Sequence, residues 1–208
     1  MTECPGSKRP YHHGDLKEAL LDAAHTLISE QGVERFSVSD ACRMAGVSPA
    51  ALYRHFSDRQ GLIDALATRG YIELATRTRA KRDAIGIGTV DALIGSGQEY
   101  VRFAIEKPAL YRLMFGRHVA NKFLMEPDPE GQKCYEVLLE AVDAYLHNHP
   151  DLPIDVMDIA VTLWALVHGV AALVIDRNVE VMAPATEPDR IIERSTRAYF
   201  AGLESVLG

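Results

Sequence analysis

Residues 37–59 have the sequence SVSDACRMAGVSPAALYRHFSDR, and this stretch indicates the architecture of the chain. Its pattern predicts two short helices joined by a tight turn. Ser37 precedes an acidic residue by three positions, as in a capping box, and Gly46 suits the left-handed conformation that ends a helix. Ser48 then caps the second helix, and Pro49 occupies its first position, where no backbone donor is needed.

The second helix, about eight residues long by this pattern, has two different faces. Leu52 and Phe56 are four residues apart, so they share one face and can pack inward. Tyr53 and Arg54 point the other way, and small Ala50 lets the backbone approach another surface closely. Because core packing gives no reason for an exposed Tyr-Arg pair, we expect this helix to enter a DNA groove. The alternative is a helical hairpin with a solvated face.

The segment from Leu16 to about Tyr71 resembles the N-terminal domain of tetracycline-repressor (TetR) family transcriptional regulators. Many positions agree at fixed spacing without gaps. Besides the amphipathic first helix, the matching residues are Phe36-Ser37-Val38, Ala45-Gly46-Val47-Ser48, Leu52-Tyr53-Arg54-His55-Phe56 and Asp58-Arg59-Gln60-Gly61-Leu62.

This resemblance implies that the second helix of the pair enters the major groove of a double-stranded DNA operator. Arg59 departs from the family, which usually has Lys there, but it keeps the cation that a phosphate contact needs. By resemblance, Pro49, Ala50 and Tyr53 approach bases, and Ser37, Arg54, His55 and Arg59 mostly contact phosphate; Ser39 and Ser48 complete the expected interface.

Composition is that of an ordinary globular protein. The 208 residues are 48% hydrophobic and 25% charged, with a net charge of −7. Residues 1–60 hold seven Lys or Arg and eight Asp or Glu, so most of the acidity lies beyond them. The DNA-binding prediction therefore rests on the helix pair and the resemblance, not on a basic domain. The three cysteines are odd in number and widely spaced, which indicates free thiols in a reducing cytoplasm.

Helical periodicity runs through nearly the whole chain, and no strand pattern appears, so the expected fold is all-α. We expect a flexible basic arm over 1–14, a three-helix head with a helix-turn-helix over 15–60, and a larger ligand-binding and dimerisation domain over 61–208. The arm either reaches phosphate or the minor groove, or is a solvated tail. Later helices are expected at about 59–81, 89–105, 109–115, 132–147 and 189–207, with a long apolar helix opened by Pro150 and Pro153.

The long apolar helix contains residues 159–175, IAVTLWALVHGVAALVI, which reach the lower edge of membrane-spanning length. A helix that is apolar all round either spans a membrane or is buried in protein. Asp residues near both ends and the absence of an aromatic belt favour burial. Its Trp164, His168 and Gly169 match a Trp-x-x-x-His-Gly subset of the TetR family. We expect this helix and the last one to pair with a second copy as a two-fold dimer.

The body is expected to hold the site for a small-molecule effector. Its aromatic and adaptable residues can line an apolar pocket, and His168 is the best polar candidate, the alternative being a core or interface histidine. The candidate ligand-binding residues are Tyr100, Phe103, Tyr111, Met114, Phe115, Trp164 and His168.

The expected function is a transcriptional repressor released from a palindromic operator by a small molecule. An activator of the same fold and a helical protein-interaction scaffold are the alternatives. No catalytic constellation or phosphate-cradling glycine loop occurs in the sequence, so we expect no enzyme activity and no cofactor. Cys4 with His12-His13, and the pair His147 and His149, lack zinc spacing, so no metal site is expected.

Overall fold

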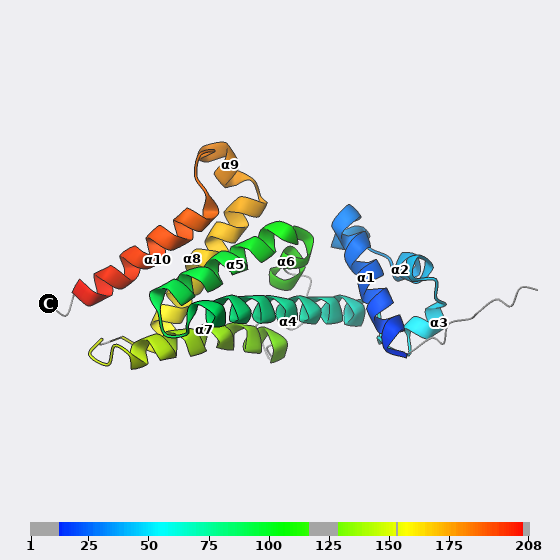
Figure 1. Cartoon of the computed structure of the whole chain (residues 1–208). Helices are drawn as coiled ribbons and strands as arrows, with labels where there is room; N and C mark the ends of the chain where they lie inside the picture. Colours follow the sequence, from blue (N-terminus) through cyan, green and yellow to red (C-terminus); the bar gives the residue numbers. More distant parts are fainter. Residues whose placement is uncertain (1–12, 117–128, 153, 206–208) are drawn as a thin grey trace, which may run out of the picture. The chain divides into compact units, whose positions relative to one another are not determined.

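The computed structural model describes residues 13–116, 129–152 and 154–205, and every regular element in these ranges is a helix (Figure 1). This confirms the all-α prediction. The chain divides into two compact units, Met1–Leu66 and Ala67–Gly208, called here the head and the body. The division falls inside one continuous helix, α4 (Arg59–Ile85), a few residues beyond the boundary expected after residue 60.

The head is built on α1 (His13–Gln31), which packs against α2 (Val38–Ala45). A 3-10 turn, η1 (Val33–Arg35), joins them. Leu20 and Ala24 of α1 are fully buried, as the helical spacing of the first apolar residues predicts. Gly32, with φ 83°, ends α1 in a conformation that few other residues adopt.

The second helix of the pair is shorter than expected. α3 covers only Pro49–Leu52, and the chain then continues as a turn. The N–H groups of Arg54 and His55 bond to carbonyls three residues back, at 3.4 and 2.8 Å. This tightening to the 3-10 pattern ends the regular helix early, while Phe56 N still bonds to Leu52 O at 3.0 Å. Leu52 and Phe56 stay on one face and are buried, as their spacing predicts.

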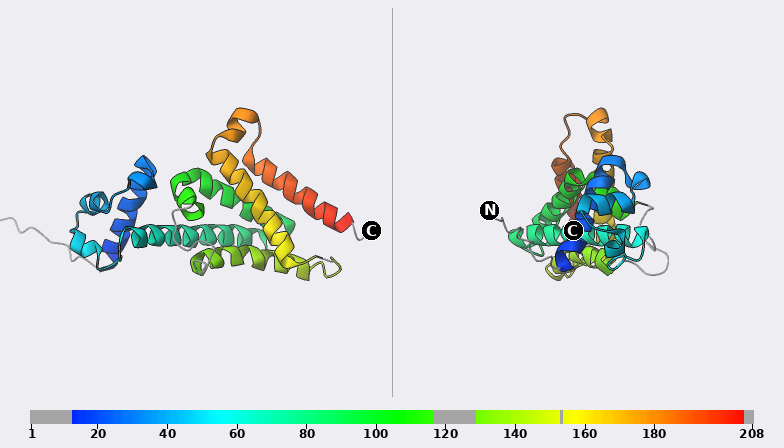
Figure 2. Two further views of the ribbon diagram at one scale, coloured as in Figure 1. Left: turned by 180° about the vertical axis from the view of Figure 1, so that it is seen from behind. Right: turned by 90° about the vertical axis from the view of Figure 1, so that its right-hand side faces the viewer.

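In the body, α5 (Val90–Glu106), α8 (Val156–Ile175) and α10 (Pro188–Ser205) pack against one another (Figure 2). Two further helices cover this group: α7 (Pro129–His147) lies against α8 and α5, and α6 (Pro108–Phe115) lies against α5. The core between α5, α7, α8 and α10 consists of Leu93, Ala141, Val142, Tyr145, Leu152, Ile159, Ala160, Leu163 and Phe200.

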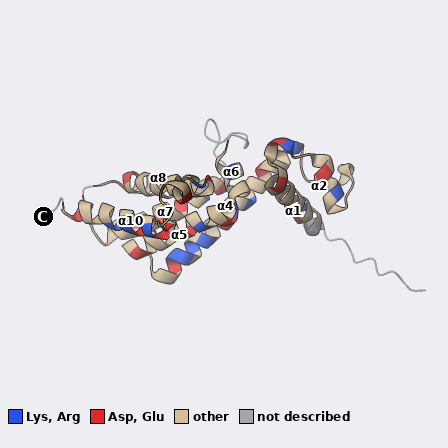
Figure 3. Cartoon of the chain, turned by 90° about the horizontal axis from the view of Figure 1, so that it is seen from above, with Lys and Arg blue, Asp and Glu red and all other residues tan. Residues whose placement is uncertain are grey.

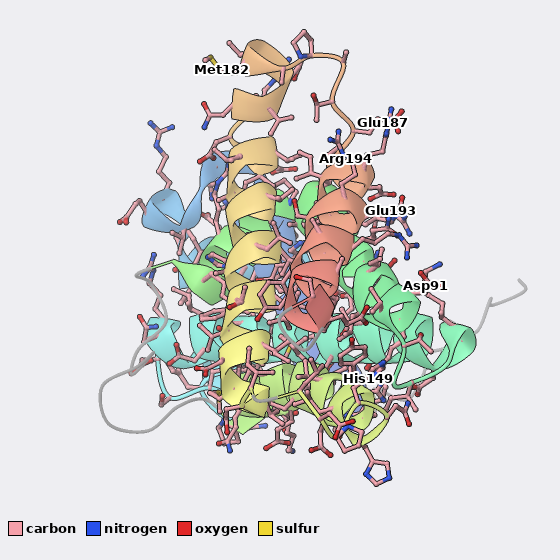
Figure 4. All side chains as sticks on the ribbon, turned by 90° about the vertical axis from the view of Figure 1, so that its left-hand side faces the viewer. Asp91, His149, Met182, Glu187, Glu193 and Arg194 are labelled. Atoms are coloured by element: carbon pink, nitrogen blue, oxygen red, sulfur yellow. The ribbon has the colours of Figure 1, made fainter. Side chains whose placement is uncertain are left out.

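The sequence analysis missed one short helix, α9 (Asn178–Met182), between α8 and α10. It has no apolar period to reveal it, and Val181 and Met182 are 75% and 83% exposed. Figure 4 shows Met182 at the end of α9. The chain enters this segment through Arg177, whose φ of 60° is left-handed.

Ion pairs connect α4 to its neighbours, and Figure 3 shows the basic residues that α4 contributes. Arg77 lies 2.6 Å from Glu99 and 2.7 Å from Glu106, both on α5. Arg82 is 3% exposed and donates to Val137 O and to Glu140 on α7. The buried guanidinium is therefore fully compensated, as a buried charge must be.

Helix α8 is long and apolar enough to cross a membrane by length and composition alone, a test that core helices of soluble proteins also pass. Its stripe through Ala160, Leu163, Val167 and Val170 is buried within the body. This stripe is thus part of the protomer's own core. The face left exposed on α8 is a different one and contains Val161, Ala165, Gly169 and Leu173.

Candidate nucleic-acid interface and body cavity

The caps of the helix pair form as the sequence predicts. Ser37 Oγ accepts from Asp40 N at 3.3 Å, and Ser48 Oγ accepts from Ala51 N at 3.3 Å. Gly46 has φ 68° and ψ 30°, and its N–H bonds to the end of α2. These contacts fix where α3 begins and which side chains it presents.

The outward side of α3 and the following turn is open to solvent. Tyr53 is 57% exposed, and Pro49, Ala50 and Arg54 are exposed as well. His55 is half-buried beside Phe56, with ring centroids 6.5 Å apart. This side of α3 and the turn therefore presents the Tyr53 ring and the Arg54 guanidinium without burying either.

The serines of the expected interface fall into two classes. Ser39 and Ser48 are exposed, at the first turn of α2 and at the cap of α3. Ser37 is half-buried because its hydroxyl caps α2. Both helix N-termini carry N–H groups that attract anions such as phosphate.

Arg59 is anchored inside the head. Its Nε donates to Phe36 O at 3.1 Å, and its Nη2 donates to Val33 O at 2.5 Å. The guanidinium also lies over the Phe36 ring, 5.6 Å from the centroid. Arg59 thus holds the entry to α2 against the start of α4. The planar guanidinium suits this role better than the Lys that is usual in the family. The expected arm, by contrast, lies almost wholly in residues 1–12, outside the described residues.

The body contains a partly open cavity of about 430 Å³, within the range of about 300–1,000 Å³ typical of small-molecule sites. Helices α4, α5, α6, α7, α8 and α10 all contribute to its wall. The described lining residues are Tyr71, Thr78, Leu93, Ser96, Gly97, Tyr100, Phe115, Gly131, Gln132, Cys134, Tyr135, Val137, Leu138, Met157, Val161, Leu163, Trp164, Val167, Ile192 and Thr196.

Of the seven expected ligand-binding residues, Tyr100, Phe115 and Trp164 line this cavity. Tyr111 and His168 lie just behind the wall, in contact with Tyr100. Phe103 and Met114 are fully buried and are not among the lining residues.

Tyr100, Tyr111 and His168 form a hydrogen-bonded cluster. His168 Nδ1 lies 2.8 Å from the Tyr111 hydroxyl and 3.0 Å from the Tyr100 hydroxyl, and the hydroxyls are 3.3 Å apart. Burial raises the pKa of Tyr111 to about 12 and raises the pKa of Tyr100 further. Both phenols are protonated near neutral pH, so either hydroxyl can donate to Nδ1.

These raised values predict that the body loses stability in alkali. Below pH 10 the tyrosines are protonated in both the folded and the unfolded chain, so their ionisation takes nothing from the free energy of unfolding. As pH rises from 10 toward about 12, tyrosines of the unfolded chain ionise while Tyr111 does not. The free energy of unfolding should then fall by about 1.4 kcal/mol per pH unit for each such tyrosine. Urea unfolding at pH 8, 10 and 11 measures this, and Tyr111→Phe should reduce the slope by that amount. Equal slopes in both proteins would contradict the prediction.

The sequence analysis missed the small polar residues of the wall. Ser96, Cys134 and Thr196 line the cavity from α5, α7 and α10. No motif marks them, because each is a single polar residue on an otherwise apolar face. Burial raises the pKa of Cys134 to about 12, so its sulphur stays a neutral thiol.

Comparison with known proteins matches both units. Residues 20–66 match the model of bacterial regulatory proteins of the tetR family, and residues 93–199 match the tetracyclin repressor-like C-terminal domain. The second match alone spans about half of the chain, and it includes Tyr100, Trp164 and His168.

Individual relatives agree with these matches. The transcriptional repressor KstR2 of Rhodococcus jostii is 28% identical over 68% of this chain and 71% of its own length. The nucleoid occlusion factor SlmA of Vibrio vulnificus is 32% identical over 53% of this chain and 55% of its own. A protein of unknown function from Rhodococcus sp. RHA1 has a similar structure, with TM-score 0.77 and 28% identity, covering 94% of this chain and 98% of its own.

A tetR-family regulator from Streptomyces coelicolor shares the fold at 22% identity, with TM-score 0.63 over 90% of this chain and 99% of its own. The head and the body thus match one family. The head has an exposed Tyr-Arg pair after a capped helix, and the helices of the body surround a cavity. The chain belongs to the tetR family of bacterial regulatory proteins and is a DNA-binding transcriptional regulator.

Proposed function

We propose that the protein is a homodimeric repressor that leaves a roughly palindromic operator when an uncharacterised small molecule enters the body cavity. The observation that carries this proposal is the cavity of about 430 Å³ whose wall includes Tyr71 of α4, the helix that begins in the head. The relative KstR2 is named a transcriptional repressor, which supports repression rather than activation.

In this proposal each head places α3 in the major groove. Pro49, Ala50 and Tyr53 approach base edges, and Arg54 and His55 contact phosphate together with the serine hydroxyls at the helix starts. Arg59 acts mainly by fixing the segment that leads into α2, because two of its N–H donors already bond to carbonyls of that segment. With so few base-reading groups, much of the recognition falls on phosphate contacts and on half-sites spaced about one helical turn or a little more apart.

The dimer is proposed to form through the exposed sides of α8 and α10, which pack side by side (Figure 4). Gly169 on α8 and Gly202 on α10 are exposed helical glycines, and a Cβ at either would meet nothing within 4 Å. Glycine inside a helix costs about 1 kcal/mol relative to alanine, yet packing within the body does not require it at either position. Close approach of a second copy supplies the reason.

Ligand response is proposed to run through α6 and α4. Phe115 of α6 and Tyr71 of α4 both line the cavity, and their rings meet edge to face at 5.7 Å. Tyr71 also donates to Met114 O at 2.6 Å, so α4 and α6 share a contact that a ligand can press on. A shift of α4 would move the two heads relative to each other and spoil their fit to the operator.

We place this function in the cytoplasm, where the operator DNA is, and assign no catalytic role to the chain. The family consists of regulators, not enzymes. We assign α8 to the body core and the dimer, not to a membrane.

A mobility-shift assay on DNA upstream of the protein's own gene tests the proposal, with a reporter strain that carries the same promoter. We expect a shifted complex, higher reporter expression when the gene is deleted, and loss of the complex with some member of a broad small-molecule panel. Lower expression on deletion would indicate an activator. Absence of any complex would favour the scaffold alternative.

A further inference from the structure

The cavity wall contains a buried hydroxyl that has no hydrogen-bond partner among the described residues. Thr196 of α10 lines the cavity and is only 2% exposed. Its hydroxyl makes no hydrogen bond within the described part of the chain. No described side-chain N or O that is sealed from solvent lacks a partner, so this hydroxyl opens on the cavity. A buried hydroxyl is unfavourable unless something in the cavity pairs with it.

Ser96 provides a second such group. It is half-buried on α5, lines the same cavity, and likewise has no hydrogen-bond partner among the described residues. Helices α5 and α10, which carry the two hydroxyls, pack directly against each other.

The other hydroxyls of the wall are already used. Thr78 Oγ1 donates to carbonyls of its own helix, 2.9 Å from Leu74 O and 3.2 Å from Ala75 O. Tyr71 donates to Met114 O, and the Tyr100 hydroxyl lies in the cluster with His168. The Tyr135 hydroxyl donates to Met157 Sδ at 3.5 Å. Thr196 and Ser96 therefore differ from these groups in having no partner among the described residues, and the buried Thr196 needs one from within the cavity.

The described part of the wall carries no charged side chain. None of the described lining residues is Asp, Glu, Lys, Arg or His. Cys134 stays a neutral thiol, and the buried Arg82 is compensated by Asp83 and Glu140. An ionised ligand would meet no opposite charge among these residues and would lose hydration wherever the wall covers it, which disfavours it.

We propose that the cavity binds an uncharged, largely apolar molecule whose hydroxyl or carbonyl oxygen pairs with the Thr196 hydroxyl, with the Ser96 hydroxyl as a further polar group of the wall. Five aromatic side chains of the wall, Tyr71, Tyr100, Phe115, Tyr135 and Trp164, supply apolar surface for the rest of the molecule. This inference rests on the proposed function and names the class of effector that acts at its cavity.

The chain contains a single tryptophan, Trp164, and it lines the cavity, so its fluorescence reports occupation directly. The probes are 1-decanol, decanoate and decylamine, which share one apolar chain, differ in charge and do not absorb with tryptophan. We expect saturable changes with decanol at a dissociation constant at least about tenfold lower than for either ion. Equal or tighter binding of decanoate or decylamine would overturn the proposal, as would no response to decanol.

A matched pair of substitutions tests the anchor. Thr196→Val removes the unpaired hydroxyl with little change of shape, and Thr78→Val removes a wall hydroxyl that its own helix already uses. We expect Thr196→Val to weaken decanol binding about fivefold or more, and Thr78→Val to change it less than about twofold. Equal effects of the two substitutions would rule out Thr196 as the anchor. Unchanged circular dichroism confirms that each variant is folded.

A parallel mobility-shift titration separates this inference from the proposed function. If decanol binds with the expected selectivity but leaves the DNA complex intact, the ligand class is supported and release through this cavity is contradicted. If decanoate or decylamine releases DNA better than decanol, release is supported and the ligand class is overturned.

Discussion

Replacing Tyr53 and Arg54 together by alanine is expected to lower affinity for operator DNA by roughly a hundred- to a thousandfold. Each base or phosphate contact contributes about 1 kcal/mol or more, and a dimer loses four side chains. Both residues are exposed, and neither contributes to the head core, so the unfolding midpoint should change little. Fluorescence anisotropy with a labelled operator measures the affinity.

Salt dependence sharpens this test. Loss of one phosphate contact in each head should reduce the slope of log affinity against log salt by about 2. Lys81→Ala is the matched control, since Lys81 is an exposed cation of the body that lies on α4, outside the helices proposed to form the dimer. Its affinity and slope should stay close to those of the unchanged protein. If the double variant binds operator as tightly as that control does, α3 is not the reading element.

The head was largely predictable because its signals are local. Ser37, Gly46 and Ser48 act within four residues of their own position, and the structure has each of them as a cap. The length of α3 was not predictable in the same way. After Leu52 the backbone changes from the α-helical to the 3-10 bonding pattern, and side-chain periodicity over one turn does not distinguish the two.

The cavity was only partly predictable, because spacing fixes which residues share a helix face but not what that face meets. Tyr100 and Phe103 both lie on α5 and are both buried, yet only Tyr100 borders the cavity. The distinction depends on the rotation of α5 against α8 and α10. The same holds for the polar residue Thr196. The sequence of an amphipathic helix does not show that the hydroxyl of one threonine faces a cavity.

Helix α8 illustrates why a uniformly apolar helix is hard to orient from sequence. Its residues Leu163 and Val167 have the same character as Val161 and Leu173, but the first two are buried in the body and the last two are nearly half exposed. The informative residue is the small one, Gly169, whose position on the exposed face no contact within the body explains. This makes it the best place to test the dimer.

Gly169→Glu is expected to convert the protein to a monomer at micromolar concentration and to lower operator affinity at least about a hundredfold. A carboxylate in the proposed interface would be buried without a partner, which disfavours association. Two heads that bind the operator as one unit have an affinity about 10² to 10⁴ times that of a single head, and the monomer loses this advantage. Sedimentation velocity and anisotropy on the same samples measure both effects.

The substitution should not damage the protomer, which is what makes its result decisive. A Cβ at position 169 meets nothing within 4 Å, and glutamate is a better helix former than glycine by roughly 0.5–1 kcal/mol. The unfolding midpoint of the monomer should therefore not fall because of strain. Ala84→Glu, at an exposed site on α4, controls for added charge and should leave both the dimer and operator binding intact. A Gly169→Glu protein that still sediments as a dimer would place the interface on another surface, and the two exposed glycines of α8 and α10 would then need a different explanation.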